Sequence, residues 1–303
     1  MKLAALLSLG VVIGGCALAS DLDAVLEPGT ELKRLATNFK FTEGPVWNSA
    51  GGFWIFSDIP ANLLYKCTPA AEVEIFRSPS GESNGNTLDR EGRLVTCEHA
   101  NRRVSRTEKD GTVATLADRW EGKRFNSPND LAVKSDGSIY FTDPDYGTPK
   151  SEARETEFCG VYRLMPDGKV TLLVKDFVKP NGIAFSPDEK RLYINDSDVS
   201  QQHMRVFDVQ PDGSLANGRI FADMKKPRGG VPDGMKVDSQ GNVYSSGSSG
   251  VWIFAPDGKQ LGIIEMPQMP ANLCFGGADG KTLFITAQTS VYTIRVKIAG
   301  DKW

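Results

Sequence analysis

A turn followed by an apolar, often aromatic, pair of residues recurs six times along the 303-residue chain. The first members of the pairs lie 41, 45, 53, 51 and 40 residues apart, and further strand-like runs follow each pair. A unit of about four short strands every 40 to 50 residues is typical of one β-propeller blade. The six pairs are Phe53-Trp54, Leu94-Val95, Ile139-Tyr140, Leu192-Tyr193, Val243-Tyr244 and Leu283-Phe284.

Six copies of this unit predict an all-β fold, a six-bladed β-propeller that forms a single domain over residues 20–303. A β-sandwich with irregular hairpins would not produce a fixed spacing, and helical periodicity is almost absent after residue 19. A ring of blades must also be closed. We expect residues 30–38, TELKRLATN, to supply an outer strand to the last blade and so join the two ends of the chain.

The first nineteen residues read as a separate segment. Lys2 precedes an apolar run and then small residues, which is typical of a secretory signal peptide over 1–19 and too short for a membrane-spanning helix. Residues 13–16, Ile-Gly-Gly-Cys, also resemble a bacterial lipobox, in which case Cys16 would carry a lipid anchor. Both alternatives predict an exported protein, either free in the periplasm or held at a membrane as a lipoprotein.

The composition excludes some partners. The net charge is −3 and no basic tract is present, so nucleic acid is not an expected partner. Four further cysteines are present besides Cys16. An exported protein could pair them as disulfides, but they are scattered with no C-x-x-C pair, and we expect them to be buried small apolar residues. They are Cys67, Cys97, Cys159 and Cys274.

A second regularity lies ten or eleven residues before each apolar pair. All six positions carry a carboxylate or an amide, although Asn-Gly and Asp-Gly are also ordinary turn sequences. In a propeller the innermost strand of every blade lines the axial channel, so a repeated position at its start implies convergence at one mouth of that channel. Proline precedes three of the six and stiffens the backbone. The six residues are Glu43, Asn84, Asn129, Asn181, Asp233 and Asn272.

Carboxylate and amide oxygens without sulfur or imidazole indicate a central site for a hard cation. Ca²⁺ is the best match because it accepts six to eight oxygen ligands in flexible geometry. Mg²⁺, Mn²⁺ and Zn²⁺ remain alternatives, although a site of three histidines is excluded because only His99 and His203 are present. The chain also lacks G-x-S-x-G, H-E-x-x-H and P-loop motifs, so a covalent serine mechanism has no support.

At these positions the chain resembles the gluconolactonase, regucalcin (senescence marker protein) and diisopropylfluorophosphatase-like family of six-bladed propellers, and most closely its bacterial gluconolactonase-like members. The segments that carry the resemblance are EGPVW at 43–47, NGNTLDREGRLVTCEH at 84–99, NSPNDLAVKSDGSIYFTDPDYG at 126–147, KPNGIAFSPDEKRLY at 179–193 and PDGMKVDSQGNVY at 232–244.

The resemblance implies Glu43, Asn181 and Asp233 as metal ligands and Asn129 as a ligand or a substrate contact. The substrate-binding arginine of regucalcin-like members is not matched, because Ser127 stands at that position. Arg124 is a nearby candidate for the same role.

These observations predict a calcium-dependent lactonase of carbohydrate metabolism, a hydrolase in which the metal polarises the carbonyl of a sugar lactone. Asp233 is the predicted catalytic residue that orients or activates water. The predicted substrate contacts are Asn84, Asn129, Arg124, His99 and Asn272, with His99 as a hydrogen-bond donor or acid and Tyr146 near the mouth.

Three alternatives remain open. A hydrolase of organophosphates or other esters would use the same site, and a non-enzymatic calcium-binding propeller would use the metal alone. A quinone-dependent sugar dehydrogenase also uses six blades, but the scarcity of histidines disfavours it.

Overall fold

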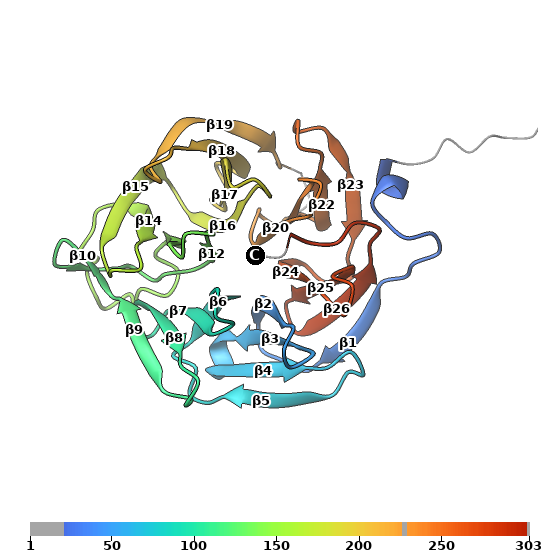
Figure 1. The fold of residues 1–303 in the computed structure, drawn as a ribbon, viewed down its shortest axis with the longest axis horizontal. Helices are drawn as coiled ribbons and strands as arrows, with labels where there is room; N and C mark the ends of the chain where they lie inside the picture. Colours follow the sequence, from blue (N-terminus) through green and yellow to red (C-terminus); the bar gives the residue numbers. More distant parts are fainter. Residues whose placement is uncertain (1–20, 226–228, 302–303) are drawn as a thin grey trace, which may run out of the picture.

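The computed structural model describes residues 21–225 and 229–301, so the predicted signal peptide at 1–19 and the lipobox cysteine Cys16 lie outside the described residues. Within the described ranges, six four-stranded antiparallel sheets form a ring around one axis (Figure 1). A two-stranded hairpin lies at the rim of the ring between the second and third blades. The predicted six-bladed propeller is therefore confirmed.

The strands of the first three blades follow each other directly along the chain, from the innermost strand to the outermost. Blade 1 contains β2 (Thr42–Asn48), β3 (Phe53–Asp58), β4 (Leu63–Cys67) and β5 (Val73–Arg77). Blade 2 contains β6 (Ser83–Leu88), β7 (Leu94–Glu98), β8 (Arg103–Thr107) and β9 (Val113–Ala117). Blade 3 contains β12 (Leu131–Val133), β13 (Ile139–Asp143), β14 (Cys159–Leu164) and β15 (Val170–Phe177).

The last three blades repeat this order, except that the sixth takes its outer strand from the N-terminal segment. Blade 4 contains β16 (Pro180–Phe185), β17 (Arg191–Asp196), β18 (His203–Val209) and β19 (Leu215–Asp223). Blade 5 contains β20 (Met235–Val237), β21 (Val243–Gly247), β22 (Gly250–Phe254) and β23 (Gln260–Glu265). Blade 6 contains β24 (Pro270–Gly276), β25 (Thr282–Ala287), β26 (Ser290–Arg295) and β1 (Lys33–Thr37). The rim hairpin is β10 (Arg119–Trp120) and β11 (Lys123–Arg124), and two short 3₁₀ helices are η1 (Asp21–Ala24) and η2 (Ile59–Ala61).

Strand β1 closes the ring. It pairs antiparallel with β26, with Lys33 opposite Thr293 and Thr37 opposite Ser290. Figure 1 shows this blue strand lying along the red last blade. The predicted closure by residues 30–38 is confirmed, because the paired residues fall inside that segment.

The blades pack on each other through the aromatic residues of their second strands. Trp54 of β3 stacks on Phe284 of β25 with ring centroids 4.9 Å apart. Tyr140 of β13 contacts Phe185 of β16 edge to face, also at 4.9 Å. Such pairs add about 0.5–1.5 kcal/mol beyond the burial of their apolar area. The recurrent apolar pairs therefore form the interfaces between blades, which is why they repeat.

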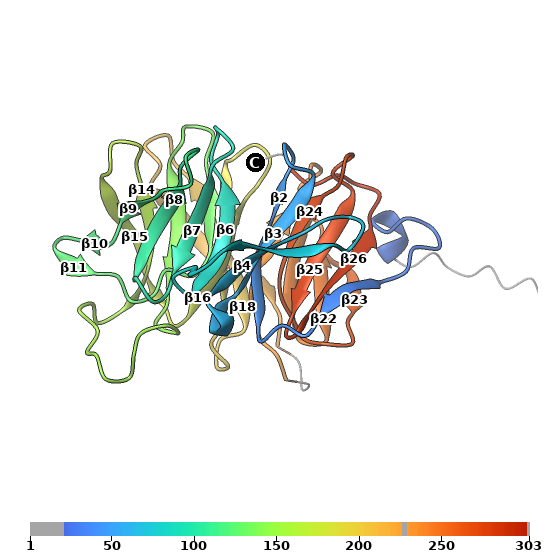
Figure 2. The ribbon, with the colours of Figure 1, turned by 90° about the horizontal axis from the view of Figure 1, so that it is seen from below.

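The four cysteines Cys67, Cys97, Cys159 and Cys274 are buried with free thiols, as the sequence predicts. Burial raises the pKa of Cys67 and Cys159 to about 11, which keeps their thiols protonated. Seen edge-on in Figure 2, the ring is a short cylinder. Across residues 21–225 and 229–301, no helix is long and apolar enough to cross a membrane.

Candidate active site

The six oxygen-bearing residues lie where the innermost strands begin, close to the axis. Glu43, Asn84 and Asn181 are each the second residue of an inner strand. Asn272 is the third residue of β24, whereas Asn129 and Asp233 each stand two residues before an inner strand. All are buried except Asp233, which is partly exposed. The predicted repetition of one position around the ring is therefore present in the structure.

Glycines next to these residues allow the inner strands to approach each other closely. A Cβ atom on Gly182 would lie 2.2 Å from the Asp233 carbonyl oxygen, and one on Gly234 would lie 2.0 Å from Asn272 Cγ. The Gly182 N–H donates to that Asp233 carbonyl at 3.1 Å. Because Gly182 lies within β16, the alternative interpretation of Asn-Gly as a turn is wrong here. The glycine is needed for contact between neighbouring blades.

Side chains from second strands hold the site residues of the next blade. Ser57 Oγ donates to the Asn84 carbonyl at 2.7 Å, and Thr142 Oγ1 donates to the Asn181 carbonyl at 2.9 Å. Asn195 Nδ2 likewise donates to the Asp233 carbonyl at 2.7 Å. Each of these donors belongs to the preceding blade, so the ring as a whole fixes where its inner strands begin.

Direct contacts join the side chains across the axis. Asn272 Nδ2 donates to Glu43 Oε2 at 2.9 Å and lies 3.4 Å from Asp130 Oδ2. The side chain of Asn181 lies close enough to Asp233 to lower the pKa of that carboxyl, which burial and the charge of Glu43 raise. Residues from blades 1, 3, 4, 5 and 6 therefore meet in one polar cluster, although they are up to 229 positions apart in the chain.

Asp130 is a member of this cluster that the sequence reasoning missed. It is buried, and its charge raises the pKa of both Glu43 and Asp233. The position ten residues before the apolar pair of blade 3 is its neighbour Asn129, so Asp130 was not selected. The carboxylate directly after the Pro128-Asn129 pair is a signal that could have identified it.

The electrostatics of the cluster favour the binding of a cation. Burial and then the charge of Asp130 raise the pKa of Glu43 to about 7, against the smaller lowering effects of Asn272 and Lys236. Burial and then the charge of Glu43 raise the pKa of Asp233 well above its usual value. Adjacent buried carboxylates cannot all ionise unless a positive charge compensates them. Protons or a metal ion can supply that charge.

The donor atoms fit a hard metal ion. Asn181 Oδ1 is buried and has no hydrogen-bond partner, which is costly unless another group binds it. Within the described ranges, no three His, Cys, Asp or Glu side chains are grouped so that they alone could hold a metal. Amide oxygens must therefore complete the ligand set. Glu43, Asn129, Asn181 and Asp233 could provide such a mixed set, which suits Ca²⁺.

His99 lies at the edge of the cluster beside Asn84. Asn84 Nδ2 is 3.2 Å from His99 Nε2, and burial lowers the pKa of His99 to about 4. The ring is therefore neutral at pH 7, and Nε2 accepts the hydrogen bond from the amide. A neutral imidazole is a poor acid, and toward Asn84 its Nε2 accepts rather than donates, so the predicted role of His99 as a donor or acid toward substrate stays a prediction.

Tyr146 and Arg124 are not among the six oxygen-bearing residues. Tyr146 is half exposed, and its pKa is raised by burial and by the charge of Asp233, which places it near the mouth as expected. Arg124 lies in the rim hairpin, with its side chain 3.9 Å from Glu152. The structure does not bring Arg124 into contact with the cluster, and its predicted substrate contact stays a prediction.

Comparison with known proteins gives a consistent match. The model of the SMP-30/Gluconolactonase/LRE-like region matches residues 41–289. A gluconolactonase of Zymomonas mobilis is 37% identical over 302 residues, which cover 92% of this chain and 85% of that protein. A pentonolactonase of Haloferax volcanii is 28% identical over 82% of each chain. The structure of a gluconolactonase from Xanthomonas campestris superposes with a TM-score of 0.84 and 36% identity, covering 91% of this chain and 92% of the other.

Proposed function

Because the chain belongs to the SMP-30/gluconolactonase/LRE-like family, we propose that it hydrolyses sugar lactones at the axial cluster with Ca²⁺ as its metal ion. The observation that carries the proposal is the cluster itself, in which Glu43, Asp233 and the unpartnered Asn181 oxygen converge in a buried place. The lactonases among the relatives identify the chemistry that this cluster would perform.

A lactone is opened when water attacks the ring carbonyl and the bond to the ring oxygen breaks. When bound, a divalent cation acts as a Lewis acid that polarises this carbonyl and stabilises the developing oxyanion. Glu43, Asn129, Asn181 and Asp233 would hold the ion. Asp233 also orients water and accepts a proton from it as the new carbon–oxygen bond forms. A proton then reaches the ring oxygen, and the product is a hydroxy acid.

The remaining amides bind the hydroxyl groups of the sugar. His99 accepts a hydrogen bond from Asn84 Nδ2, which leaves the Asn84 oxygen to accept one from a substrate hydroxyl. Asn272 Nδ2 lies within hydrogen-bond distance of both Glu43 and Asp130 and so restrains those carboxylates, and its contact with substrate stays a prediction. Asn129 serves as a ligand or a substrate contact, and Arg124 remains a peripheral candidate for substrate binding.

The proposal is tested by hydrolysis of glucono-1,5-lactone and of pentonolactones, each with metal-depleted protein and after Ca²⁺ is restored. We expect loss of activity on chelation, recovery with Ca²⁺, and weaker recovery with Mg²⁺. A folded protein that hydrolyses none of these lactones with any divalent ion would contradict the proposal. Full activity after exhaustive chelation would contradict its metal.

We further propose that the protein acts after export to the periplasm, either free or anchored through Cys16. The support is the sequence of residues 1–19. Mass spectrometry of the protein from its native cells distinguishes the alternatives, since cleavage after Ala19 gives an unmodified N-terminus whereas lipidation gives an acylated Cys16. An intact Met1 in a cytoplasmic fraction would contradict export.

A further inference from the structure

In three of the six blades, the second strand ends on a buried aspartate. These are Asp58 at the end of β3, Asp143 at the end of β13 and Asp196 at the end of β17, with exposed fractions of 1%, 0% and 2%. None of the three belongs to the polar cluster, and the function proposed above gives them no role. A buried carboxylate must be compensated by strong hydrogen bonds, so their partners are informative.

Each of these aspartates accepts hydrogen bonds from two successive backbone N–H groups, one on each oxygen. Asp58 accepts from Lys40 N at 2.9 Å on Oδ2 and from Phe41 N at 3.1 Å on Oδ1. Asp143 accepts from Asn126 N on Oδ2 and from Ser127 N on Oδ1, both at 2.8 Å. Asp196 accepts from Val178 N at 2.9 Å on Oδ2 and from Lys179 N at 3.0 Å on Oδ1. The assignment of oxygens is the same in all three blades.

The position of these N–H groups is also the same. They belong to the residues three and two places before a predicted metal ligand, namely before Glu43, Asn129 and Asn181. The strand pairing agrees, since Asp58 lies opposite Thr42 and Asp196 lies opposite Pro180, each directly before a ligand. One carboxylate therefore fixes the approach of the chain to each of these ligands.

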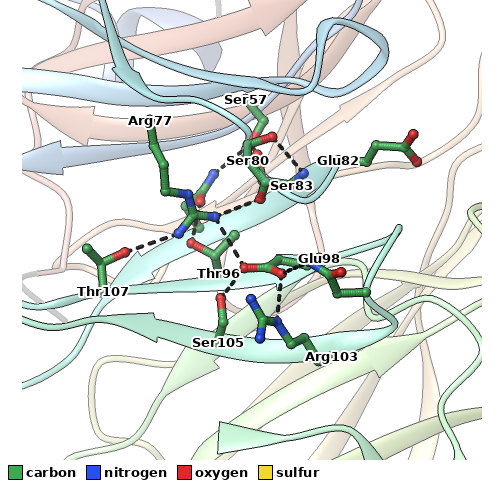
Figure 3. A network of polar contacts seen from close by, with 12 residues as sticks. Ser57, Arg77, Ser80, Glu82, Ser83, Thr96, Glu98, Arg103, Ser105 and Thr107 are labelled. Carbon is green, nitrogen blue, oxygen red and sulfur yellow. Dashed lines mark hydrogen bonds and ion pairs between the residues drawn. The ribbon is translucent and has the colours of Figure 1, made fainter. Parts of the chain in front are cut away.

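Among the residues that the structure describes, the other three blades lack this arrangement. In blade 2 the corresponding residue is Glu98, and its carboxylate binds side chains instead (Figure 3). It accepts from Arg103 Nε at 2.7 Å and Ser105 Oγ at 2.6 Å, and Arg77 lies at 3.3 Å. Strands β21 and β25 end on Gly247 and Ala287, which have no carboxylate. Within residues 21–225 and 229–301, the paired N–H arrangement thus occurs in three of the four blades that supply predicted metal ligands, and the blade of Asp233 lacks the aspartate.

We propose that Asp58, Asp143 and Asp196 are positioning residues that hold the backbone before Glu43, Asn129 and Asn181 in the geometry that binds the metal ion. The inference rests on the proposed function, because it assumes that these residues bind a cation. Only one or two residues separate each held N–H pair from its ligand. Few backbone torsions are therefore left free, and the ligand oxygens are preorganised before the ion arrives.

Replacement of each aspartate by asparagine tests the inference. Asparagine has the same shape but only one acceptor oxygen, so its NH₂ group would face one of the two N–H donors. Asp58→Asn, Asp143→Asn and Asp196→Asn are each expected to weaken Ca²⁺ binding about 10- to 100-fold in isothermal titration, a range typical when groups that support metal ligands are changed.

Two matched controls separate positioning from general stability. Asp257 accepts a backbone N–H from Lys259 at 2.9 Å in an exposed turn, so Asp257→Asn should leave Ca²⁺ affinity unchanged. Glu98→Gln removes a buried carboxylate at the same point of blade 2, so it should lower the melting temperature of the metal-free protein more than it lowers Ca²⁺ affinity. Aspartate variants that lose thermal stability but bind Ca²⁺ as tightly as the wild type would overturn the inference.

Amide hydrogen exchange of the unaltered protein covers the case in which a variant does not fold. Exchange at residues 40–41, 126–127 and 178–179 is expected to be slower than at Lys259 already without Ca²⁺, because these N–H groups are held before the ion arrives. Exchange at those amides in the metal-free protein as fast as at Lys259 would also overturn the inference. A wild-type protein that binds no divalent ion would instead contradict the metal site itself, so the two failures are distinguishable.

Discussion

The two ends of the six inner strands are built from the same repeat but have opposite character. At their beginnings lie the carboxylates of Glu43, Asp130 and Asp233, and burial together with neighbouring negative charge raises the pKa of Glu43 and Asp233. Further along the same strands, a cavity of about 730 Å³ is lined mainly by apolar side chains such as Trp47 and Phe185. Residues 299–301 near the chain end also line this cavity.

The difference separates what the ring needs for folding from what it needs for chemistry. The apolar side chains that line the far cavity stabilise the inner strands by burial, as the apolar side chains between the blades do. The clustered carboxylates instead destabilise the metal-free protein, because their charges repel and are poorly hydrated. Such a conflict with ordinary packing is expected at a functional site. Changes at the two ends should therefore have different consequences for activity and stability.

The largest effect is expected from the carboxylates themselves. Asp233→Asn removes the proposed base and one metal ligand, and we expect kcat/KM for glucono-1,5-lactone to fall about 10²- to 10⁴-fold. Glu43→Gln should abolish tight Ca²⁺ binding with a comparable loss of activity. Both variants should be at least as thermally stable as the wild type when metal is absent, since a repelling charge is removed.

The control for these variants lies at the other end of the same strands. Phe185→Leu changes an apolar residue that lines the far cavity, and it should lower stability by about 1 kcal/mol while kcat/KM stays near the wild-type value. If Asp233→Asn and Glu43→Gln retained full activity, the cluster would not be the catalytic site.

A pair of glycine variants sharpens the comparison. Gly182→Ala forces a Cβ against the Asp233 carbonyl, whereas Gly168→Ala meets no atom within 4 Å but must adopt a φ of +89°. Each should cost about 1–3 kcal/mol of unfolding free energy, one by overpacking and the other by backbone strain. Only Gly182→Ala should also weaken Ca²⁺ binding and lower kcat. Equal Ca²⁺ affinity in the two variants would show that the close approach of the blades does not position the site.

The pH dependence of stability should reverse when metal is added. The folded-state pKa of Glu43 is raised from 4.5 to about 7, so its stabilising effect in the metal-free protein is complete below pH 4.5. That effect is lost as the pH rises through 7. Ca²⁺ requires ionised carboxylates, so its affinity should fall about tenfold per pH unit below 7. Thermal unfolding between pH 5 and 8, with chelator or with Ca²⁺, measures both trends, and parallel curves would contradict them.

The regular part of the molecule could be predicted from the sequence. The recurrent apolar pairs predicted the blades because each pair packs between neighbouring blades. Residues 30–38 predicted the closing strand because the last blade needs a fourth strand to complete the ring. The same periodicity predicted that six oxygen-bearing residues, among them Glu43, Asn181 and Asp233, stand at one level of the ring, while their role as metal ligands stays a prediction. These successes depend on symmetry rather than on any single motif.

What escaped prediction does not follow the repeat. Asp130 stands one residue after the repeated position, which in blade 3 is occupied by the amide residue Asn129. Asp58, Asp143 and Asp196 act through the backbone of another strand, so their role appears only when the pairing is known. Arg124 was selected by its nearness in sequence to Asn129, but it lies in β11 of the hairpin at the rim of the ring.

The smallest effect is expected at His99, which contacts the cluster only through Asn84. His99→Leu removes the acceptor of the Asn84 amide, and loss of one hydrogen bond of about 0.5–1.5 kcal/mol should raise KM about 3- to 10-fold with little change in kcat. His99→Gln can supply an amide oxygen in place of Nε2 and should restore most of the affinity. Because the pKa of His99 is lowered to about 4, both variants should keep the wild-type shape of the pH–rate profile between pH 6 and 8. Loss of one limb of that profile would show that His99 transfers a proton. His99 would then be a catalytic residue rather than a residue that only positions Asn84.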